Sequence, residues 1–231
     1  MVRQERAVRT RQALIRSAAE VFDRGGYAKA KLADISAGAG VSQGALHFHF
    51  DGKEAIAGAV ESAALRTLTR AAHIAYRERA FTLQSLADMS HAFADLMHWD
   101  VVVRSGFRLN NDSARSGDRG MGQLWHGCIT RLLDEAAAAQ ELNADVQLPR
   151  ATCAIVGATA GIGLLVTGDK ESPARVALTG FWQGVLGGLA TPRVLARLRP
   201  EGTDAVVAKA IVVSGNAFQT SFTPGPLAGR V

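Results

Sequence analysis

Several side chains suited to reading the edges of base pairs stand close together between positions 42 and 49. They are Ser42, Gln43, Gly44, Ala45, His47 and His49. Short and polar side chains let a helix approach the floor of a DNA major groove, where a glutamine can pair with adenine through two hydrogen bonds. Gly44, which has no side chain, would let the backbone come especially close. These residues predict a surface that contacts double-stranded DNA.

The pattern around these residues predicts the elements that would position them. Two short helices are expected over 32–37 and 43–48, joined by a turn that contains Gly38 and Gly40. Ser42 is a suitable N-cap for the second helix. A pair of short helices joined by a glycine turn is typical of a helix-turn-helix motif.

Apolar residues recur at helical spacing along most of the remaining chain. We therefore expect an all-α protein with about ten helices. Gly25-Gly26 should end the first of them by supplying a left-handed C-cap. The expected helices are 8–24, 32–37, 43–48, 54–79, 83–99, 101–109, 121–140, 150–167, 173–189 and a further one that begins at Pro192.

The positive charge of the chain is concentrated at its start. The formal net charge is +5, and residues 1–53 hold nine Lys and Arg against five Asp and Glu. A basic N-terminal segment followed by a nearly neutral remainder indicates that the segment binds a polyanion. A basic helix face that is only exposed to solvent would have a similar composition. Arg6, Lys31 and Lys53 are candidates for phosphate contacts, and the start of the helix after Lys53 offers free backbone N–H groups.

Other kinds of site find little support in the sequence. Cys128 and Cys153 are expected to be buried free thiols in a reducing cytoplasm. His91, Asp95 and His98 could share a helix face, but a metal site would need more ligands at tighter spacing. We expect no metal, no cofactor and no catalytic group. The uncharged stretch 151–168 reaches the length of a membrane span, but its Gly, Ala and Thr content favours a buried interface helix.

The stretches RTRQALIRSAAEVFDRGGY and KLADISAGAGVSQGALHFHFDGKEAI resemble the N-terminal domain of TetR-type repressors over residues 6–60. The resemblance implies a homodimer that binds a palindromic operator and a C-terminal helical domain that dimerises and binds a small inducer, which releases the DNA. It predicts a DNA-binding domain over 1–53, a ligand-binding and dimerisation domain over 54–213, and a frayed tail over 214–231. The expected DNA-binding residues are Arg6, Lys31, Ser42, Gln43, Gly44, Ala45, His47, His49 and Lys53.

Two residues depart from the pattern of that family. His47 stands where a tyrosine usually contacts phosphate, and it could donate a hydrogen bond in the same way, with shorter reach and some pH dependence. Gln43 stands where Lys or Arg is common, so the preferred operator sequence is expected to differ.

The form GALHFHF, the phrase GFRLNNDSAR and a tryptophan before RLLDEA are similar to the γ-butyrolactone receptor branch of the family. In that branch a pocket tryptophan closes over the signal, and Trp125 occupies the matching position. The branch also contains pseudo-receptors that respond to antibiotics or other signals. The expected ligand-binding residues, any of which could instead be plain core, are Trp125, Met89, Phe93, Phe107, Thr159 and Trp182.

Glycines spaced four apart, at 157 and 161 and at 180, 184 and 188, allow close helix contact and suggest a dimer interface. Another class of protein also fits parts of the sequence, namely a small-ligand carrier or an enzyme. In such a protein the basic N-terminal helices would only be exposed to solvent and would not bind DNA. The basic, glycine-punctuated segment 31–53 favours the regulator.

Overall fold

The computed structural model describes residues 2–112, 120–165 and 173–215. Within these ranges the chain is built from helices, as the sequence predicts. The helices are α1 (Val2–Lys29), α2 (Leu32–Gly38), α3 (Gln43–His49), α4 (Lys53–Arg77), α5 (Thr82–Trp99), α6 (Val101–Asn110), α7 (Gly120–Ala138), α8 (Leu148–Leu165), α9 (Pro173–Leu189), α10 (Pro192–Leu195) and α11 (Asp204–Gly215).

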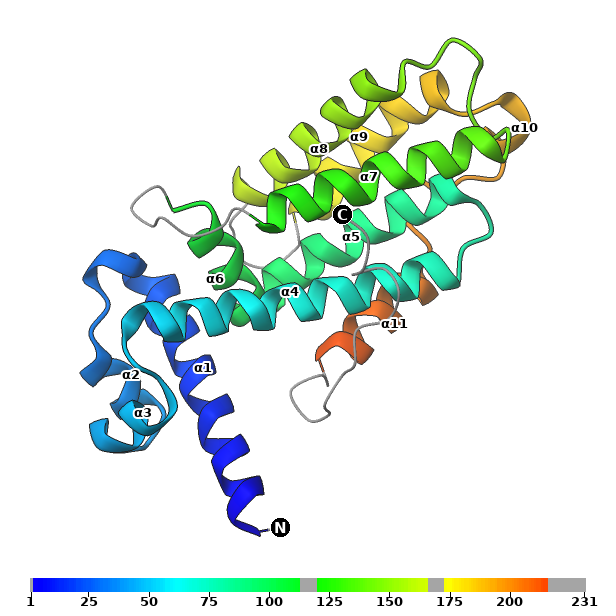
Figure 1. Cartoon of the computed structure of the whole chain (residues 1–231). Coiled ribbons are helices and arrows are strands. Elements are labelled where there is room, and N and C mark those ends of the chain that lie inside the picture. Colours follow the sequence, from blue (N-terminus) through cyan, green and yellow to red (C-terminus); the bar gives the residue numbers. More distant parts are fainter. Residues whose placement is uncertain (1, 113–119, 166–172, 216–231) are drawn as a thin grey trace.

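The helices form two regions joined by the long helix α4 (Figure 1). Helices α1, α2 and α3 lie at one end, and α4 leads from them along the body. Helix α5 lies beside α4, with α7, α8 and α9 on one side of this pair and α11 on the other. Helix α6 lies where the two regions meet and contacts both α1 and α4.

Helix α1 is longer than expected, but it breaks where the sequence predicts. Gly26 has φ 72° and ψ 166°, a left-handed conformation that favours glycine, and it interrupts the helix. A final turn then continues to Lys29. The break redirects the chain so that α2 packs back across α1.

A first core lies among α1, α2, α3 and the start of α4. Leu14, Phe22, Ile35 and Leu46 are buried in it. The hydroxyl of Ser17 on α1 donates a hydrogen bond of 2.8 Å to the carbonyl of Ile35. This core does not end at residue 53, because it also contains Val60 and Ala63 of α4 and Val102 and Leu109 of α6. The domain boundary at 53 stays a prediction.

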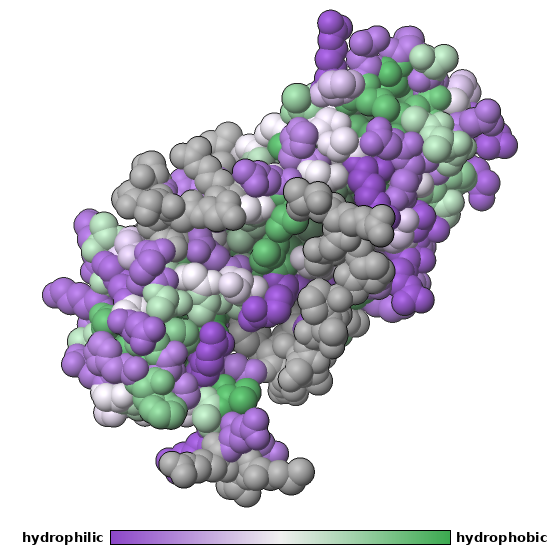
Figure 2. All heavy atoms as spheres, viewed as in Figure 1, coloured by the Kyte–Doolittle hydropathy of each residue, from purple (hydrophilic) through white to green (hydrophobic). Residues whose placement is uncertain are grey.

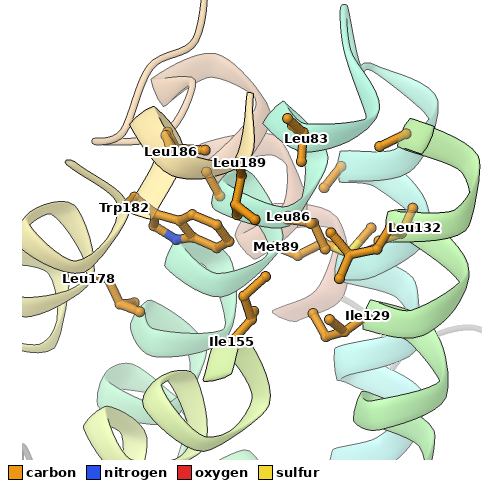
Figure 3. Packing of buried hydrophobic residues seen from close by; sticks show 14 of the residues in the cluster. Leu83, Leu86, Met89, Ile129, Leu132, Ile155, Leu178, Trp182, Leu186 and Leu189 are labelled. Atoms are coloured by element: carbon orange, nitrogen blue, oxygen red, sulfur yellow. The ribbon is translucent and has the colours of Figure 1, made fainter. Parts of the chain in front are cut away.

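A second core fills the space between α5, α7, α8 and α9. Figure 3 shows Trp182 pointing into this cluster, beside Ile155 and Met89. The indole N–H of Trp182 donates to the hydroxyl of Ser90 at 2.8 Å. This hydrogen bond satisfies the polar atom of a completely buried side chain.

The N-terminus of helix α5 is capped by a carboxylate from a distant part of the chain. Glu141 is buried and accepts hydrogen bonds from the backbone N–H groups of Thr82, at 2.8 Å, and Leu83, at 2.9 Å. A negative charge at a helix N-terminus is stabilised by these free N–H groups and by the helix dipole. Glu141 therefore fixes the end of α7 against the start of α5.

One helix was expected after Pro192, but the structure contains two. Helix α10 ends at Leu195, and α11 begins only at Asp204. The segment between them is held by buried polar groups of α5. Thr203 N–H donates to Asp88 at 2.6 Å, and His91 Nε2 donates to the carbonyl of Pro200 at 2.8 Å. Pro200 and the left-handed Gly202 are breaking signals that the prediction did not use. The tail expected from residue 214 falls mainly outside the described residues.

Candidate DNA-binding surface and ligand site

The second helix of the predicted helix-turn-helix, α3, is fixed by its inner face. Leu46 and the following Phe50 are buried in the first core. Ser42 caps the helix, since its hydroxyl accepts a hydrogen bond of 3.1 Å from the backbone N–H of Ala45. The outer face is therefore fixed as well, and it exposes Gln43, Gly44 and His47.

A groove of about 450 Å³ lies between the first turns of α1 and the outer side of α3. It brings together four of the predicted DNA-binding residues, Arg6, Ser42, Ala45 and His49. Gln43, Gly44 and His47 do not line this groove, although they lie exposed on the same helix. Figure 2 shows mainly hydrophilic residues, with single hydrophobic ones among them, on the visible face of this end of the molecule.

Phe48 also lines this groove, although it was not among the predicted DNA-binding residues. Its side chain is 79% exposed. The signal was available in the sequence, because helical spacing places Phe48 opposite the buried Leu46 and Phe50.

The two lysines predicted to contact DNA have different surroundings. Lys31 is exposed directly before α2, at a helix N-terminus where free N–H groups favour anions. The ammonium of Lys53 instead donates to the carbonyls of Tyr27, Ala28 and Ala30 at 3.0, 3.2 and 3.3 Å.

The ammonium of Lys53 also lies 4.6 Å from the centre of the Tyr27 ring. An ammonium has three N–H groups, and here each has a carbonyl partner. Lys53 therefore joins the end of α1 to the start of α4, a role that its position in the sequence did not predict. The hydroxyl of Tyr27 donates to Glu54 at 2.7 Å and strengthens the same connection.

A second connection joins α1 to α5 and α6 through an arginine. Arg104 on α6 contacts both carboxylate oxygens of Asp23 on α1 at 3.0–3.2 Å. Its remaining terminal nitrogen donates to the carbonyls of Met97 and His98, at 3.1 and 2.8 Å. Arg108 adds a hydrogen bond of 2.8 Å to Asp23. We call Asp23, Arg104 and Arg108 the Asp23 cluster.

Three of the predicted ligand-binding residues come together away from the groove. The indole N–H of Trp125 donates to the hydroxyl of Thr159 at 2.9 Å. The rings of Trp125 and Phe93 lie 4.8 Å apart. All three side chains are partly buried, on α7, α8 and α5 respectively. An aromatic wall with a few polar groups suits a small and mostly apolar molecule.

The other predicted ligand-binding residues lie elsewhere. Phe107 is partly buried and packs, like Phe93, against a small cluster formed by residues of α4, α5, α6, α7 and α11. Met89 and Trp182 are completely buried in the second core. A role for any of these residues in ligand binding stays a prediction.

The two cysteines are both free thiols, but they are not both buried. Cys153 is exposed on α8, which corrects the expectation of two buried thiols. Burial raises the pKa of the Cys128 thiol to about 11. Cys128 is therefore protonated and weakly nucleophilic near neutral pH.

His91, Asp95 and His98 do not form a metal site. In the described part of the chain, no three His, Cys, Asp or Glu residues are grouped so that they could hold a metal ion. His91 is buried against Pro200, and Asp95 pairs with Arg175 at 3.6 Å. None of the described helices is long and apolar enough to cross a membrane.

Comparisons with known proteins define the class to which this fold and surface belong. The sequence model described as "Bacterial regulatory proteins, tetR family" matches residues 14–60, which cover the helix-turn-helix. The A-factor receptor protein of Streptomyces griseus is 30% identical over 211 residues, which cover 91% of this chain and 74% of the relative.

Solved structures agree with these sequence matches. TylP, a TetR regulator from Streptomyces fradiae, has a TM-score of 0.69 and 29% identity, with 93% of each chain covered. A γ-butyrolactone receptor described as ArpA-like has a TM-score of 0.71 and 25% identity, with 93% of this chain and 98% of that chain covered. CprB from Streptomyces coelicolor, solved with its biological operator sequence, has a TM-score of 0.68 and 26% identity, with the same coverage.

The fold and surface are those of a helix-turn-helix regulator that binds DNA. This chain belongs to the TetR family, in the branch that contains the A-factor receptor and the ArpA-like γ-butyrolactone receptors. The resemblance seen in the sequence is thereby confirmed.

Replacing Lys53 tests its role at the connection between α1 and α4. Lys53→Met keeps the apolar stem but leaves the carbonyls of Tyr27, Ala28 and Ala30 without a cation. We expect a loss of about 1–3 kcal/mol in the free energy of unfolding, measured by denaturant titration. Lys31→Met is the matched control, and this exposed site should change stability by less than about 0.5 kcal/mol.

An unchanged free energy of unfolding in Lys53→Met would instead indicate that Lys53 contacts DNA. In that case Lys53→Met would unfold like the wild type, and it would lose affinity equally for all duplexes with a weaker dependence on salt.

Proposed function

We propose that this protein is a ligand-responsive repressor that binds a palindromic operator as a homodimer and leaves it when a small signalling molecule binds. The observation that carries the proposal is the recognition helix, which is held rigidly from inside and exposes polar and short side chains beside a groove that contains Arg6. An α-helix of this kind fits a major groove. The related CprB was solved with its operator, which supports operator binding.

The outer faces of α8 and α9 support the homodimer. Most of their exposed positions carry small or apolar residues, with Arg150 and Gln183 as exposed polar residues among them. The small or apolar residues are Cys153, Ala154, Gly157, Val176, Gly180, Gly184, Gly187 and Gly188. A Cβ atom added at any of these glycines would meet no atom within 4 Å, so the space above them is open. Figure 2 shows hydrophobic residues gathering over these two helices. Such a surface fits a second copy of itself about a two-fold axis.

The site around Trp125 supports a small inducer such as a γ-butyrolactone. Phe93 and Trp125 provide an aromatic wall, and the hydroxyl of Thr159 provides a polar group at its edge. A γ-butyrolactone is small and mostly apolar with a few oxygens, which matches this composition. The same site would also suit a pseudo-receptor that responds to an antibiotic, so the choice between these signals depends on a ligand screen.

The Asp23 cluster would carry the signal from this site to the DNA-binding helices. Phe93 lies one turn before Met97 on α5, and the carbonyl of Met97 accepts from Arg104. Phe107 lies one turn after Arg104 on α6. A molecule that displaces α5 or α6 would therefore strain the contacts of Arg104 with Asp23, and with them the position of α1.

Operator binding is the first test of the proposal. A duplex selected by the protein from a random library, together with the DNA upstream of its own gene, should be shifted in a gel at low salt. Two chains should bind each palindromic site, as measured by analytical ultracentrifugation. Gln43→Ala should relax base preference at one position of each half-site, because a bidentate contact discriminates by about 1–3 kcal/mol. Failure to bind any duplex at low salt would instead favour a small-ligand protein without a DNA function.

Replacing Trp125 separates ligand binding from DNA binding. Trp125→Ala should shift the selected duplex like the wild type, but a synthetic γ-butyrolactone should release it only at concentrations at least about tenfold higher. Trp99→Ala, at a tryptophan that is 73% exposed, is the matched control and should respond normally. Loss of DNA binding in Trp125→Ala would show that this residue is structural.

Replacing Arg104 tests the route between the two sites. Arg104→Met should keep the increase in melting temperature that the lactone causes, whereas the concentration needed to release DNA should rise about tenfold, a coupling of about 1.4 kcal/mol. Arg108→Met removes only the more exposed arginine and should have a smaller effect. If Arg104→Met fails to bind DNA without ligand, the cluster holds the fold together and does not transmit the signal.

A further inference from the structure

Phe48 projects from the recognition helix on the side opposite its buried residues. Leu46 and Phe50 hold the inner face of α3 in the first core, and helical spacing directs Phe48 to the opposite side. Its 79% exposure is the highest among the exposed large hydrophobic residues of the described chain. Its ring meets that of His49 edge-on at 5.2 Å, a contact along the helix surface that leaves the outer face of the ring open.

The residues beside Phe48 on its own helix face are short and leave its ring projecting from the helix. One turn earlier stands Gly44, where the nearest atom to an added Cβ would be the hydroxyl of Ser42 at 3.9 Å. Ala45 on the other flank is also short. Arg6 and Thr10 line the far side of the groove and would attract a phosphate backbone. The apolar ring therefore projects from a helix whose surroundings favour a polyanion, and an apolar protein partner would not be attracted to them.

Only one apolar group is displayed on base edges in the major groove, and that group is the C5 methyl of thymine. A phenyl ring has no hydrogen bond to offer, so it can discriminate between base pairs only through this methyl group. We propose that Phe48 is a specificity-determining residue that packs against a thymine methyl in each half of the operator. This inference rests on the proposed operator binding and adds a base preference to it.

The experiment compares thymine with deoxyuridine, which lacks the methyl group but pairs identically. In a duplex selected by the protein from a random library, each thymine is replaced in turn by deoxyuridine, and affinity is measured by fluorescence anisotropy at fixed salt. The wild type should lose about fourfold in affinity at one thymine of each half-site, the value expected for one methyl group. Phe48→Ala should bind more weakly and equally well to both forms of the duplex.

Two further variants and a stability measurement distinguish a methyl contact from a general loss of affinity. His47→Ala, at the neighbouring exposed position, should keep the full sensitivity to deoxyuridine. Unchanged melting temperature in Phe48→Ala would show that the fold is intact, as expected for an exposed side chain. Phe48→Leu should retain part of the sensitivity because leucine is also apolar.

Three results would overturn the inference while leaving operator binding in place. The first is a wild type that is insensitive to deoxyuridine at every thymine. The second is a Phe48→Ala variant that keeps the same fourfold difference, which would mean that another residue contacts the methyl. The third is a Phe48→Ala variant that loses affinity equally for duplexes of every sequence, which would place the ring against the sugar–phosphate backbone. A wild type that selects no duplex would overturn the proposed function itself.

Discussion

Arg104 of α6 binds the ends of two other helices at once. Its guanidinium contacts the carboxylate of Asp23 near the end of α1 and two carbonyls at the end of α5, while the residue itself belongs to α6. These hydrogen bonds are charge-assisted, and the cation also lies at the negative end of the α5 dipole. This contact helps to hold α1 against the body of the protein, together with the packing of α1 on α4 and α6. Because α2 packs on α1, the helix-turn-helix is connected to the body in part through Arg104.

The start of α4 gives the DNA-binding helices a second connection to the body. Lys53 and Glu54 bind the end of α1, and α4 then continues without interruption into the other two clusters. Further along, Gly106 of α6 lies so close to α4 that an added Cβ would stand 2.4 Å from the Cβ of Ala64. Such close packing leaves no space between α4 and α6 at this point. Both connections to α1 therefore come from a closely packed pair of helices.

The sequence predicted most of the fold because its signals are local. Helical periodicity, the Gly25-Gly26 stop and the Ser42 cap each act within a few residues, and the helices they predicted are present. The contacts between distant residues were not predictable in this way. Nothing near Glu141 indicates that it caps α5, and nothing near Asp23 indicates its arginine partners. A cation at a helix start suits an anion, so the sequence predicts a phosphate contact for Lys53, which stays a prediction. The three carbonyls within its reach are brought there by packing, which the local sequence does not reveal. Phe48 is not predicted because the signal for base contacts lies in polar and short side chains, and an aromatic residue on a helix is more often part of the core.

The hydrogen bond between Trp125 and Thr159 has a consequence for the chemistry of any signal. The indole N–H already has a good acceptor in a partly buried position. A molecule that pushes the ring aside with apolar groups alone would leave that N–H without a partner, at a cost of about 1–3 kcal/mol. A molecule with a carbonyl or ether oxygen at the same place would accept the hydrogen bond and avoid that cost. A signal that binds beside Trp125, as proposed above, would therefore be selected by the position of one oxygen atom in addition to its size.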